Sequence, residues 1–244
     1  MSRRRFFVEG VHRGQAELTG EEAKHLTRVL RVEVGQHYEI SDNERVWLAE
    51  VESARKEHVV FRVMEPVELR PESVAIHVYA AIIKFDHFEW MIEKATELGA
   101  ARIIAVIATR TEHGLERGAV KRVERWRRIA LEASQQSRRD RLPEIAEAMT
   151  FRASLKAEAD VRLVLDEART GVPLLAALPP RLQAADTVAL LIGPEGGWTD
   201  EERAGFGPAG WRAVSLGPLI LRAETAAMAA VAVVSAAWES AVRV

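Results

Sequence analysis

The segment Gly193-Pro194-Glu195-Gly196-Gly197 places three glycines around one carboxylate. Glycine lets a backbone come close to a ligand and leaves amide N–H groups exposed, so this loop is suited to cradle a polar ligand beside Glu195. A plain glycine-rich turn between a strand and a helix explains the same residues about as well. The sequence contains no Walker A motif, so we do not expect a P-loop nucleotide site.

A second segment carries an arginine and a glutamate at the entrance of an otherwise apolar helix. Arg222 and Glu224 follow a turn fixed by Pro218, and a run rich in alanine and valine comes after them. Helix capping with a surface ion pair accounts for both side chains without a ligand. However, both segments follow predicted strands, and ligands of open α/β sheets bind beyond the carboxyl ends of the strands. We therefore expect the two loops to share one pocket.

The elements that must position these loops alternate between strands and helices from residue 74 onward. The near-continuous apolar run 74–83 is typical of a strand buried on both faces. Asp86 is expected to cap the next helix, and Thr199 with Glu202 has the Thr-x-x-Glu pattern of a capping box. Further strands are expected at 102–107, 161–165, 188–192 and 213–216, and further helices at 120–136 and 223–241. This alternation predicts an α/β domain with a mostly parallel sheet over residues 74–244.

Residues 1–70 have a different pattern. Short segments at 36–41, 46–51 and 58–63 predict strands, the last of them ended by Pro66. Thr19 and Glu22 again form a Thr-x-x-Glu pattern, which predicts one short helix with a capping box. We therefore expect a small β-barrel-like domain with one helix, joined to the α/β domain by a linker at residues 69–72.

Composition and charge narrow the function classes. The 244 residues include no cysteine, which excludes a disulfide framework, a thiolate nucleophile and a cysteine-ligated metal site. The net charge is −2, but residues 102–141 carry eleven basic and five acidic side chains, a local surplus typical of a phosphate-facing surface or of a solvated face. No apolar run reaches the roughly 20 residues that cross a bilayer, and no signal peptide is recognisable. We expect a soluble cytoplasmic protein that uses neither a membrane nor a metal ion.

Taken together, the two loops resemble those of the RsmE-type methyltransferases, which belong to the SPOUT class. The resemblance rests on Gly193-Pro194-Glu195-Gly196-Gly197 followed by Leu216-Gly217-x-x-x-Leu221-Arg222-x-Glu224-Thr225-Ala226. It extends over nearly the whole chain, through Arg4-Arg5-Phe6-Phe7, His25-Leu26-x-x-Val29-Leu30-Arg31, and the segments 93–99 and 132–137. One departure is Arg138, where the family usually has glycine, so the backbone conformation there and the role of Arg139 are open.

This resemblance implies a fold, a cofactor and a substrate. The expected fold is a SPOUT α/β domain with a deep trefoil knot, preceded by a PUA-like RNA-binding domain and assembled as a homodimer through the last helix. The expected cofactor is S-adenosylmethionine, and the expected substrate is N3 of a uracil in 16S ribosomal RNA of the small subunit. The implied cofactor contacts are Leu165, Asp166, Ile192, Gly193, Pro194, Gly196, Gly197, Leu216, Gly217, Leu221 and Thr225. The implied RNA contacts are Arg3, Arg4, Arg5, Arg28, Arg31, Arg138 and Arg139.

The chemistry of N3 methylation assigns roles to the catalytic candidates. N3 of uracil carries a proton on the Watson–Crick edge, so the target base must be unpaired or flipped out. Removing that proton leaves negative charge on the flanking carbonyl oxygens, which we expect Arg222 to stabilise. A carboxylate then takes the proton or orients the base, with Glu195 ahead of Glu224. Alternatively, Glu195 only holds the loop or the cofactor in place. Trp198 could stack on a ligand ring, but we expect it in the core, which is more usual for a tryptophan beside a turn between a strand and a helix.

Three other functions fit parts of the sequence. Ribose 2′-O-methyltransferases of the same class resemble each other in an asparagine within the loop that here reads Leu221–Thr225, and the only asparagine of this chain is Asn43. A non-catalytic RNA-binding module would keep the N-terminal arginines but would need no intact glycine loops. An enzyme acting on a small phosphate compound would use the Gly193–Gly197 loop but leaves the N-terminal domain unexplained.

Overall fold

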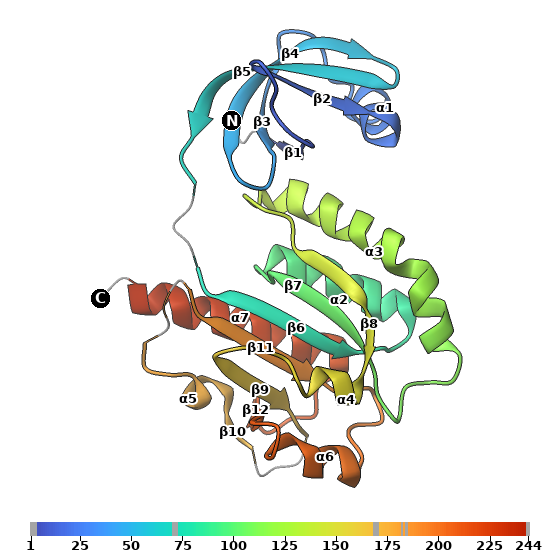
Figure 1. Cartoon of the computed structure of the whole chain (residues 1–244), viewed down its shortest axis with the longest axis vertical. Coiled ribbons are helices and arrows are strands. Elements are labelled where there is room, and N and C mark those ends of the chain that lie inside the picture. The colour runs from blue at the N-terminus through green and yellow to red at the C-terminus, as the bar shows by residue number, and fades with distance from the viewer. Residues whose placement is uncertain (1–3, 70–72, 168–170, 182, 184, 243–244) are drawn as a thin grey trace. The chain divides into compact units, whose positions relative to one another are not determined.

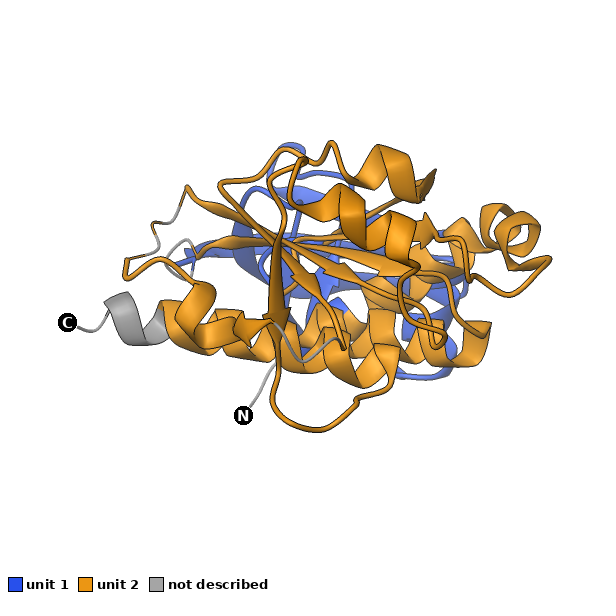
Figure 2. Ribbon diagram, turned by 90° about the horizontal axis from the view of Figure 1, so that it is seen from below, with its two compact units in different colours: residues 1–71, 134–142 blue, residues 72–133, 143–244 orange. Residues whose placement is uncertain are grey.

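The computed structural model describes residues 4–69, 73–167, 171–181, 183 and 185–242, and its chain divides into two compact units (Figure 1). Residues 1–71 and 134–142 form the first unit, and residues 72–133 and 143–244 form the second (Figure 2). The segment 134–142 therefore packs with the N-terminal part of the chain, although it lies in the middle of the sequence.

The first unit is a five-stranded mixed sheet with one helix. Its elements are β1 (Arg5–Phe7), β2 (Gln15–Thr19), α1 (Gly20–Arg28), β3 (His37–Ser41), β4 (Val46–Arg55) and β5 (His58–Val67). The strand order is β1-β3-β4-β5-β2, in which β1 is parallel to β3 and the other pairs are antiparallel. Phe6, Leu26, Ile40 and Phe61 are fully buried in its core. The prediction of a small β domain with one helix is confirmed.

Two local predictions for this unit are wrong. The side chain of Thr19 makes no capping hydrogen bond to α1, so the first Thr-x-x-Glu pattern is not a capping box. The strand β5 continues through Pro66, which pairs with Trp47 of β4. Pro66 lies beyond Arg62, the last residue of β5 that pairs with β2, so this part of β5 is an edge strand. A missing N–H is tolerated at such an edge.

The second unit contains a seven-stranded sheet in which every neighbouring pair of strands is parallel. The strands are β6 (Ala75–Ala81), β7 (Arg102–Ile107), β8 (Glu144–Thr150), β9 (Val161–Leu165), β10 (Val172–Pro173), β11 (Thr187–Ile192) and β12 (Arg212–Ser215). Their order is β10-β12-β9-β11-β6-β7-β8. The helices are α2 (Phe85–Glu97), α3 (Leu115–Ser137), α4 (Phe151–Ser154), α5 (Leu174–Ala177), α6 (Asp200–Phe206) and α7 (Ala223–Val242), and the last turn of α3, from residue 134, belongs to the first unit. The predicted mostly parallel sheet is confirmed.

Helices cover both faces of this sheet, and alternate residues of each strand enter one of two cores. Val78 of β6 packs with α2, α3, α5 and α7, while the neighbouring Tyr79 packs with residues of α4 and α6. Connections that cross the sheet toward β8 carry their helices on the first face, and those that cross toward β12 carry them on the second. Crossover connections between parallel strands are right-handed, so connections that run in opposite directions across the sheet place their helices on opposite faces. The trefoil knot that the resemblance implies stays a prediction.

Two predictions for the second unit need correction. The helix α2 begins at Phe85 with Lys84 as its N-cap, so Asp86 lies inside the first turn and is not the cap. The strand β8 was not expected, because its sequence Glu-Ile-Ala-Glu-Ala-Met-Thr is poor in β-branched residues and only Ile145 is fully buried. As the outermost strand of the sheet, β8 needs less apolar surface than the central strands.

Candidate active site

Three loops meet at one edge of the parallel sheet. They follow β9, β11 and β12, and β9 lies between the other two strands in the sheet. Because all three strands run parallel, their carboxyl ends point to the same edge. The start of α2 belongs to this edge as well, since it follows β6, the other neighbour of β11. Both chemistry-bearing loops therefore lie at the same edge of the sheet, with β9 between their strands, and the expectation that they share one pocket stays a prediction.

The loop after β11 is held tightly by its own neighbours. A Cβ at Gly193 would lie 3.0 Å from the Trp198 ring, and a Cβ at Gly196 would lie 3.3 Å from the Arg110 side chain. Gly197 has φ +68°, a conformation that favours glycine, and a Cβ there would overlap the Glu167 carboxylate. Contacts within the protein therefore already favour glycine at these three positions, most strongly at Gly197 because of its backbone conformation.

Trp198 holds this loop to the strand beside it. Its side chain is fully buried against Phe151 and Phe206, and its indole N–H donates a hydrogen bond to the carbonyl oxygen of Leu165 at 3.0 Å. The expected core role of Trp198 is thereby confirmed. The loop ends in the predicted capping box, in which the Thr199 hydroxyl accepts from the N–H of Glu202 and the Glu202 carboxylate accepts from the N–H of Thr199.

Glu195 stands at the exposed tip of the same loop. Within the described residues its carboxylate makes no hydrogen bond and no ion pair, whereas Pro194 beside it is buried. Ile192, the last residue of β11, is buried in the core below the loop. Glu195 is therefore free to meet a ligand, and none of the described residues fixes its orientation.

The loop after β9 is held by Arg203, which no sequence motif singles out. Nε and Nη2 of Arg203, on α6, donate to Asp166 at 3.1–3.2 Å, and Nη2 also donates to Glu167. These hydrogen bonds, first of all the one with Asp166, raise the pKa of Arg203 above its ordinary value. The side chain of Asp166 is only 7% exposed, so its carboxylate is already committed within the protein. For cofactor contact this leaves mainly the backbone of Leu165 and Asp166.

The loop after β12 is open by comparison. Gly217 has φ +128°, and a Cβ there would meet no atom within 4 Å. Leu219 and Ile220 are 78% and 85% exposed, and Arg222 is exposed beside them. Leu216 and Leu221 at the two ends of the loop are half-buried, and Thr225 on the first turn of α7 is exposed. The apolar and cationic side chains of this loop are thus available to a ligand.

Glu224 is placed differently from the other catalytic candidates. Glu224 is the second residue of α7 and is only 4% exposed. Its Oε1 atom lies 3.2 Å from Nδ1 of His87 on α2. His87 was missed because it precedes Glu224 by more than a hundred residues and has no motif around it. The parallel order of the strands, which brings the starts of α2 and α7 to one edge, is what joins them.

The arginines expected to contact RNA in the first unit have unequal surroundings. Arg4, Arg28 and Arg31 are exposed, whereas Arg3 lies outside the described residues. Arg5 is buried and forms ion pairs with Glu39 at 2.8 Å and with Asp140. The guanidinium of Arg5 therefore ties the segment 134–142 to the sheet of this unit.

The same segment contains Arg138 and Arg139, both half-buried. Arg138 has φ +53°, in the left-handed region that favours glycine, and its carbonyl oxygen accepts a hydrogen bond from Arg5 at 3.1 Å. Arg139 donates from Nε to the carbonyl oxygen of Arg141 at 3.1 Å. The position where the resembling family usually has glycine thus keeps a glycine-like backbone while carrying an arginine side chain.

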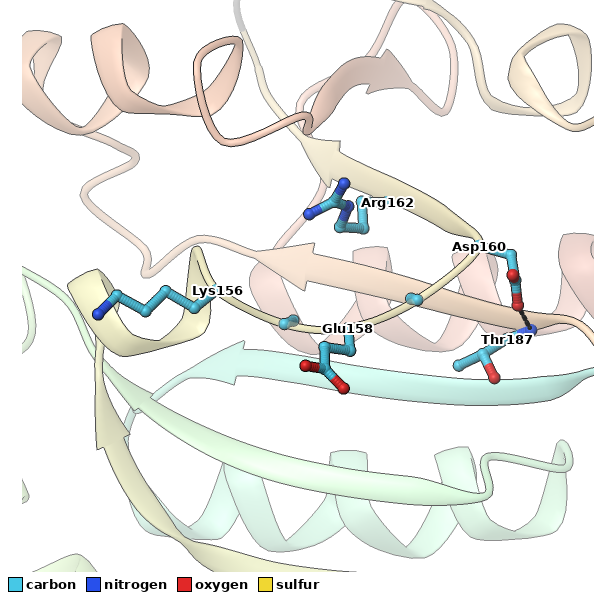
Figure 3. Close-up of a pocket in the computed structure, with 7 residues that line it drawn as sticks. Lys156, Glu158, Asp160, Arg162 and Thr187 are labelled. Carbon is cyan, nitrogen blue, oxygen red and sulfur yellow. Dashed lines mark hydrogen bonds between the residues drawn. The ribbon is translucent and has the colours of Figure 1, made fainter.

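A hollow of about 480 Å³ lies at the opposite, amino-terminal edge of the sheet (Figure 3). It is lined by Lys156, Ala157, Glu158, Ala159, Asp160, Arg162 and Thr187. Asp160 accepts a hydrogen bond from the N–H of Thr187 at 2.8 Å, and the labelled charged side chains point in different directions. These charges do not converge on one ligand position, so the hollow is not part of the candidate site.

The described part of the chain contains no cluster of three or more histidine, aspartate or glutamate side chains placed to hold a metal ion. Among the same residues, no helix combines the length and apolarity that crossing a membrane requires. The spacing Gly-x-Gly-x-x-Gly occurs at residues 205–210, but it begins in the last turn of α6 and leads into β12, so it is not the strand-to-helix turn that binds a dinucleotide.

Comparisons with known proteins agree with this architecture. Residues 70–235 match the family model of an RNA methyltransferase domain, and residues 18–64 match that of an RNA methyltransferase PUA domain. The chain is 34% identical over 227 residues to ribosomal RNA small subunit methyltransferase E of Synechocystis, an alignment that covers 91% of this chain and 73% of the relative.

Two solved structures extend the similarity to nearly the whole fold. A Legionella pneumophila methyltransferase in complex with its cofactor SAM superposes with a TM-score of 0.87 at 30% identity, covering 97% of this chain and 98% of that chain. Ribosomal RNA small subunit methyltransferase E from Neisseria gonorrhoeae, bound to S-adenosyl methionine, gives a TM-score of 0.87 at 27% identity with the same coverage. The expected α/β methyltransferase domain and PUA domain are both confirmed. This chain belongs to the family of ribosomal RNA small subunit methyltransferase E.

Proposed function

We propose that this protein transfers a methyl group from S-adenosylmethionine to N3 of a specific uridine in 16S ribosomal RNA of the small subunit. The observation that carries the proposal is the meeting of three loops at one sheet edge, with exposed Arg222 in a loop that lacks asparagine. Family membership supports an RNA substrate and a methyl donor of this type. That the methyl group goes to the base, and not to the ribose, is proposed from the residues of the loop that contains Arg222.

The residues at this edge fit the cofactor. The loop after β11 offers a fixed backbone, and the loop after β12 offers open space at Gly217 and exposed apolar side chains for an adenine ring. The proposed contacts are Leu165, Asp166, Ile192, Gly193, Pro194, Gly196, Gly197, Leu216, Gly217, Leu221 and Thr225. When bound, the cofactor supplies a methyl group on a positively charged sulfur.

The protein's own part in the reaction is alignment and charge stabilisation. Holding N3 in line with the methyl group supplies about 7–11 kcal/mol of barrier reduction. We assign Arg222 to the negative charge that develops on the carbonyl oxygens beside N3, because its guanidinium is exposed and always charged. Glu195 lies within the loop of proposed cofactor contacts, between Pro194 and Gly196, so we assign it to orienting the cofactor or the uracil base.

RNA binding is assigned to the exposed arginines of the first unit. Arg4, Arg28 and Arg31 are available for phosphate contact, and Arg3, Arg138 and Arg139 remain in the proposed set. Arg5 contributes by holding the segment of Arg138 in place. The enzyme is proposed to work in the cytoplasm on its ribosomal substrate.

A homodimer is proposed to form along α7. The proposed contact face consists of five small side chains at helical spacing, Ala226, Ala229, Ala230, Val233 and Ala237. Ala230 is buried within the subunit, whereas the other four are only half-buried. A row of small apolar side chains at helical spacing allows close packing of a second helix. Sedimentation at rising protein concentration tests this assembly, and a strictly monomeric species would contradict it.

The test of the proposed function combines cofactor binding with methyl transfer. We expect calorimetry to show S-adenosylmethionine binding and a labelled methyl group to enter small subunits that lack base methylation. Cofactor binding without transfer to any ribosomal RNA would contradict the proposed reaction. No cofactor binding, with RNA binding retained, would favour a non-catalytic RNA-binding module instead.

A further inference from the structure

The buried carboxylate of Glu224 has one partner that reaches the surface. Nδ1 of His87 lies 3.2 Å from Glu224 Oε1, within hydrogen-bonding distance. The two side chains differ in exposure, at 37% for His87 and 5% for Glu224. One end of the pair is therefore fixed inside the protein, and the other end is open to a ligand.

This pair lies at the edge of the sheet that carries the proposed site. The helix α2 follows β6, which is the neighbour of β11, and His87 is on its first turn. Glu224 comes two residues after Arg222. The His87 imidazole thus contacts a side chain that lies only two residues after Arg222.

The contact also favours one tautomer of the ring. A carboxylate has no hydrogen to donate, so a neutral His87 that carries its proton on Nδ1, the nitrogen facing Glu224, keeps a lone pair on Nε2. The Asp86 carboxylate is 3.9 Å from Nε2, beyond hydrogen-bonding distance. From α3, the Arg122 guanidinium lies 4.3 Å from the centre of the ring of Phe85, which is two residues before His87.

The two carboxylates considered above are less suited to accept a proton. Glu224 is buried and occupied by His87, and Glu195 has no partner among the described residues that would orient it. A histidine oriented by a buried carboxylate is a recurrent general-base arrangement in enzymes. His87 with Glu224 has this arrangement.

We propose that His87 is the general base of the reaction and that Glu224 is its positioning residue, an inference that rests on the proposed N3 methylation. Nε2 of His87 takes the N3 proton as the N3 electron pair forms a bond to the methyl carbon. The carbon–sulfur bond breaks with its electron pair left on sulfur, which gives a neutral thioether. The proton then passes from His87 to solvent.

The first test is the methyl-transfer rate in single turnover at saturating cofactor and RNA, from about pH 6 to about pH 9. We expect His87→Ala and His87→Gln to lose about 100-fold or more near neutral pH, with cofactor and RNA affinities within about threefold. The deficit should shrink toward alkaline pH, where N3 loses its proton to solvent, and added imidazole should restore part of the His87→Ala rate. Glu224→Gln should lower the methyl-transfer rate less than the His87 variants do, and this deficit should also shrink toward alkaline pH.

The control is His58→Ala, which removes another histidine–glutamate pair, with Glu17 at 2.9 Å, on β5 of the first unit. Its rate should stay within about twofold of wild type. A His87 variant that keeps more than a third of the wild-type rate at neutral pH overturns the proposal, and so does a deficit independent of pH. The tautomer of wild-type His87, read from ¹⁵N NMR shifts, gives a test without turnover: a proton on Nε2 in the neutral ring contradicts it. If the wild type itself makes no 3-methyluridine, the proposed function fails, and not only the assignment of the base.

Discussion

The two loops that resemble the family's motifs are built in opposite ways, although they leave the same edge of the same sheet. The loop after β11 is packed so closely that a Cβ at any of its three glycines would press against Trp198, Arg110 or Glu167. The loop after β12 leaves Leu219 and Ile220 almost fully exposed, and a Cβ at Gly217 would meet no atom within 4 Å. The first loop therefore serves as a rigid support, while the side chains of the second are left to meet the ligands.

Trp198→Ala gives the strongest test of the rigid loop. The substitution removes a fully buried indole and its hydrogen bond to Leu165, so we expect the free energy of unfolding to fall by about 3–5 kcal/mol. Urea denaturation followed by circular dichroism measures the change. A loss below about 1 kcal/mol would show that this loop is not the support described here.

Arg222→Ala tests the ligand-facing loop. We expect the single-turnover rate of methyl transfer to fall by about 100–1,000-fold, because a donor to the developing oxyanion is lost. Cofactor affinity should change by less than about tenfold, or 1.4 kcal/mol, and the free energy of unfolding should hardly change because the side chain is exposed. Lost cofactor binding with a normal rate at saturation would remove Arg222 from the catalytic residues.

Gly197→Ala sharpens the comparison within the rigid loop. The left-handed backbone alone costs a non-glycine residue about 1–2 kcal/mol, and the Cβ would also overlap the Glu167 carboxylate. We expect a loss of about 2 kcal/mol in the free energy of unfolding. Glu167→Ala in the same background should recover part of it, and no recovery would mean that the overlap with Glu167 is not the cause.

The sequence predicted the position of both loops but not the contacts that make them different. The same Thr-x-x-Glu pattern is a capping box at Thr199 and not at Thr19. Thr19 is the last residue of β2 and is followed by Gly20 at φ +65°, so the sheet determines its geometry. Thr199 follows a loop and is free to turn its hydroxyl to the helix.

Pairs that are distant in sequence were beyond any local pattern. Arg203 with Asp166, and His87 with Glu224, meet only because parallel strands bring their ends to one edge. By contrast, the strands of the central sheet were predictable because each is a short apolar run between turns. What stayed hidden is therefore the long-range pairing, which includes the proposed base.

Arg138→Gly extends the comparison to the first unit. Arg138 has a left-handed backbone that glycine adopts at lower cost, so we expect the substitution to raise the free energy of unfolding by about 0.5–1 kcal/mol. RNA affinity should weaken, and its salt dependence should drop by about one phosphate contact. A less stable variant with unchanged RNA affinity would assign the Arg138 side chain a structural role.

Leu219→Ser and Ile220→Ser should have the smallest effect on stability. Both side chains are exposed, so we expect the free energy of unfolding to change by less than about 0.5 kcal/mol. The affinity for S-adenosylmethionine or for a second subunit should weaken measurably. A large loss of stability with both affinities unchanged would contradict the open character of this loop.

The identity of the methylated nucleoside tests the central claim most directly. Small subunits lacking base methylation are incubated with the enzyme and labelled S-adenosylmethionine, and their 16S RNA is digested to nucleosides for mass spectrometry. The account predicts that the label appears in 3-methyluridine and is lost with Arg222→Ala. Label in a 2′-O-methyl nucleoside would contradict the assignment of the Leu221–Thr225 loop and of the reaction itself.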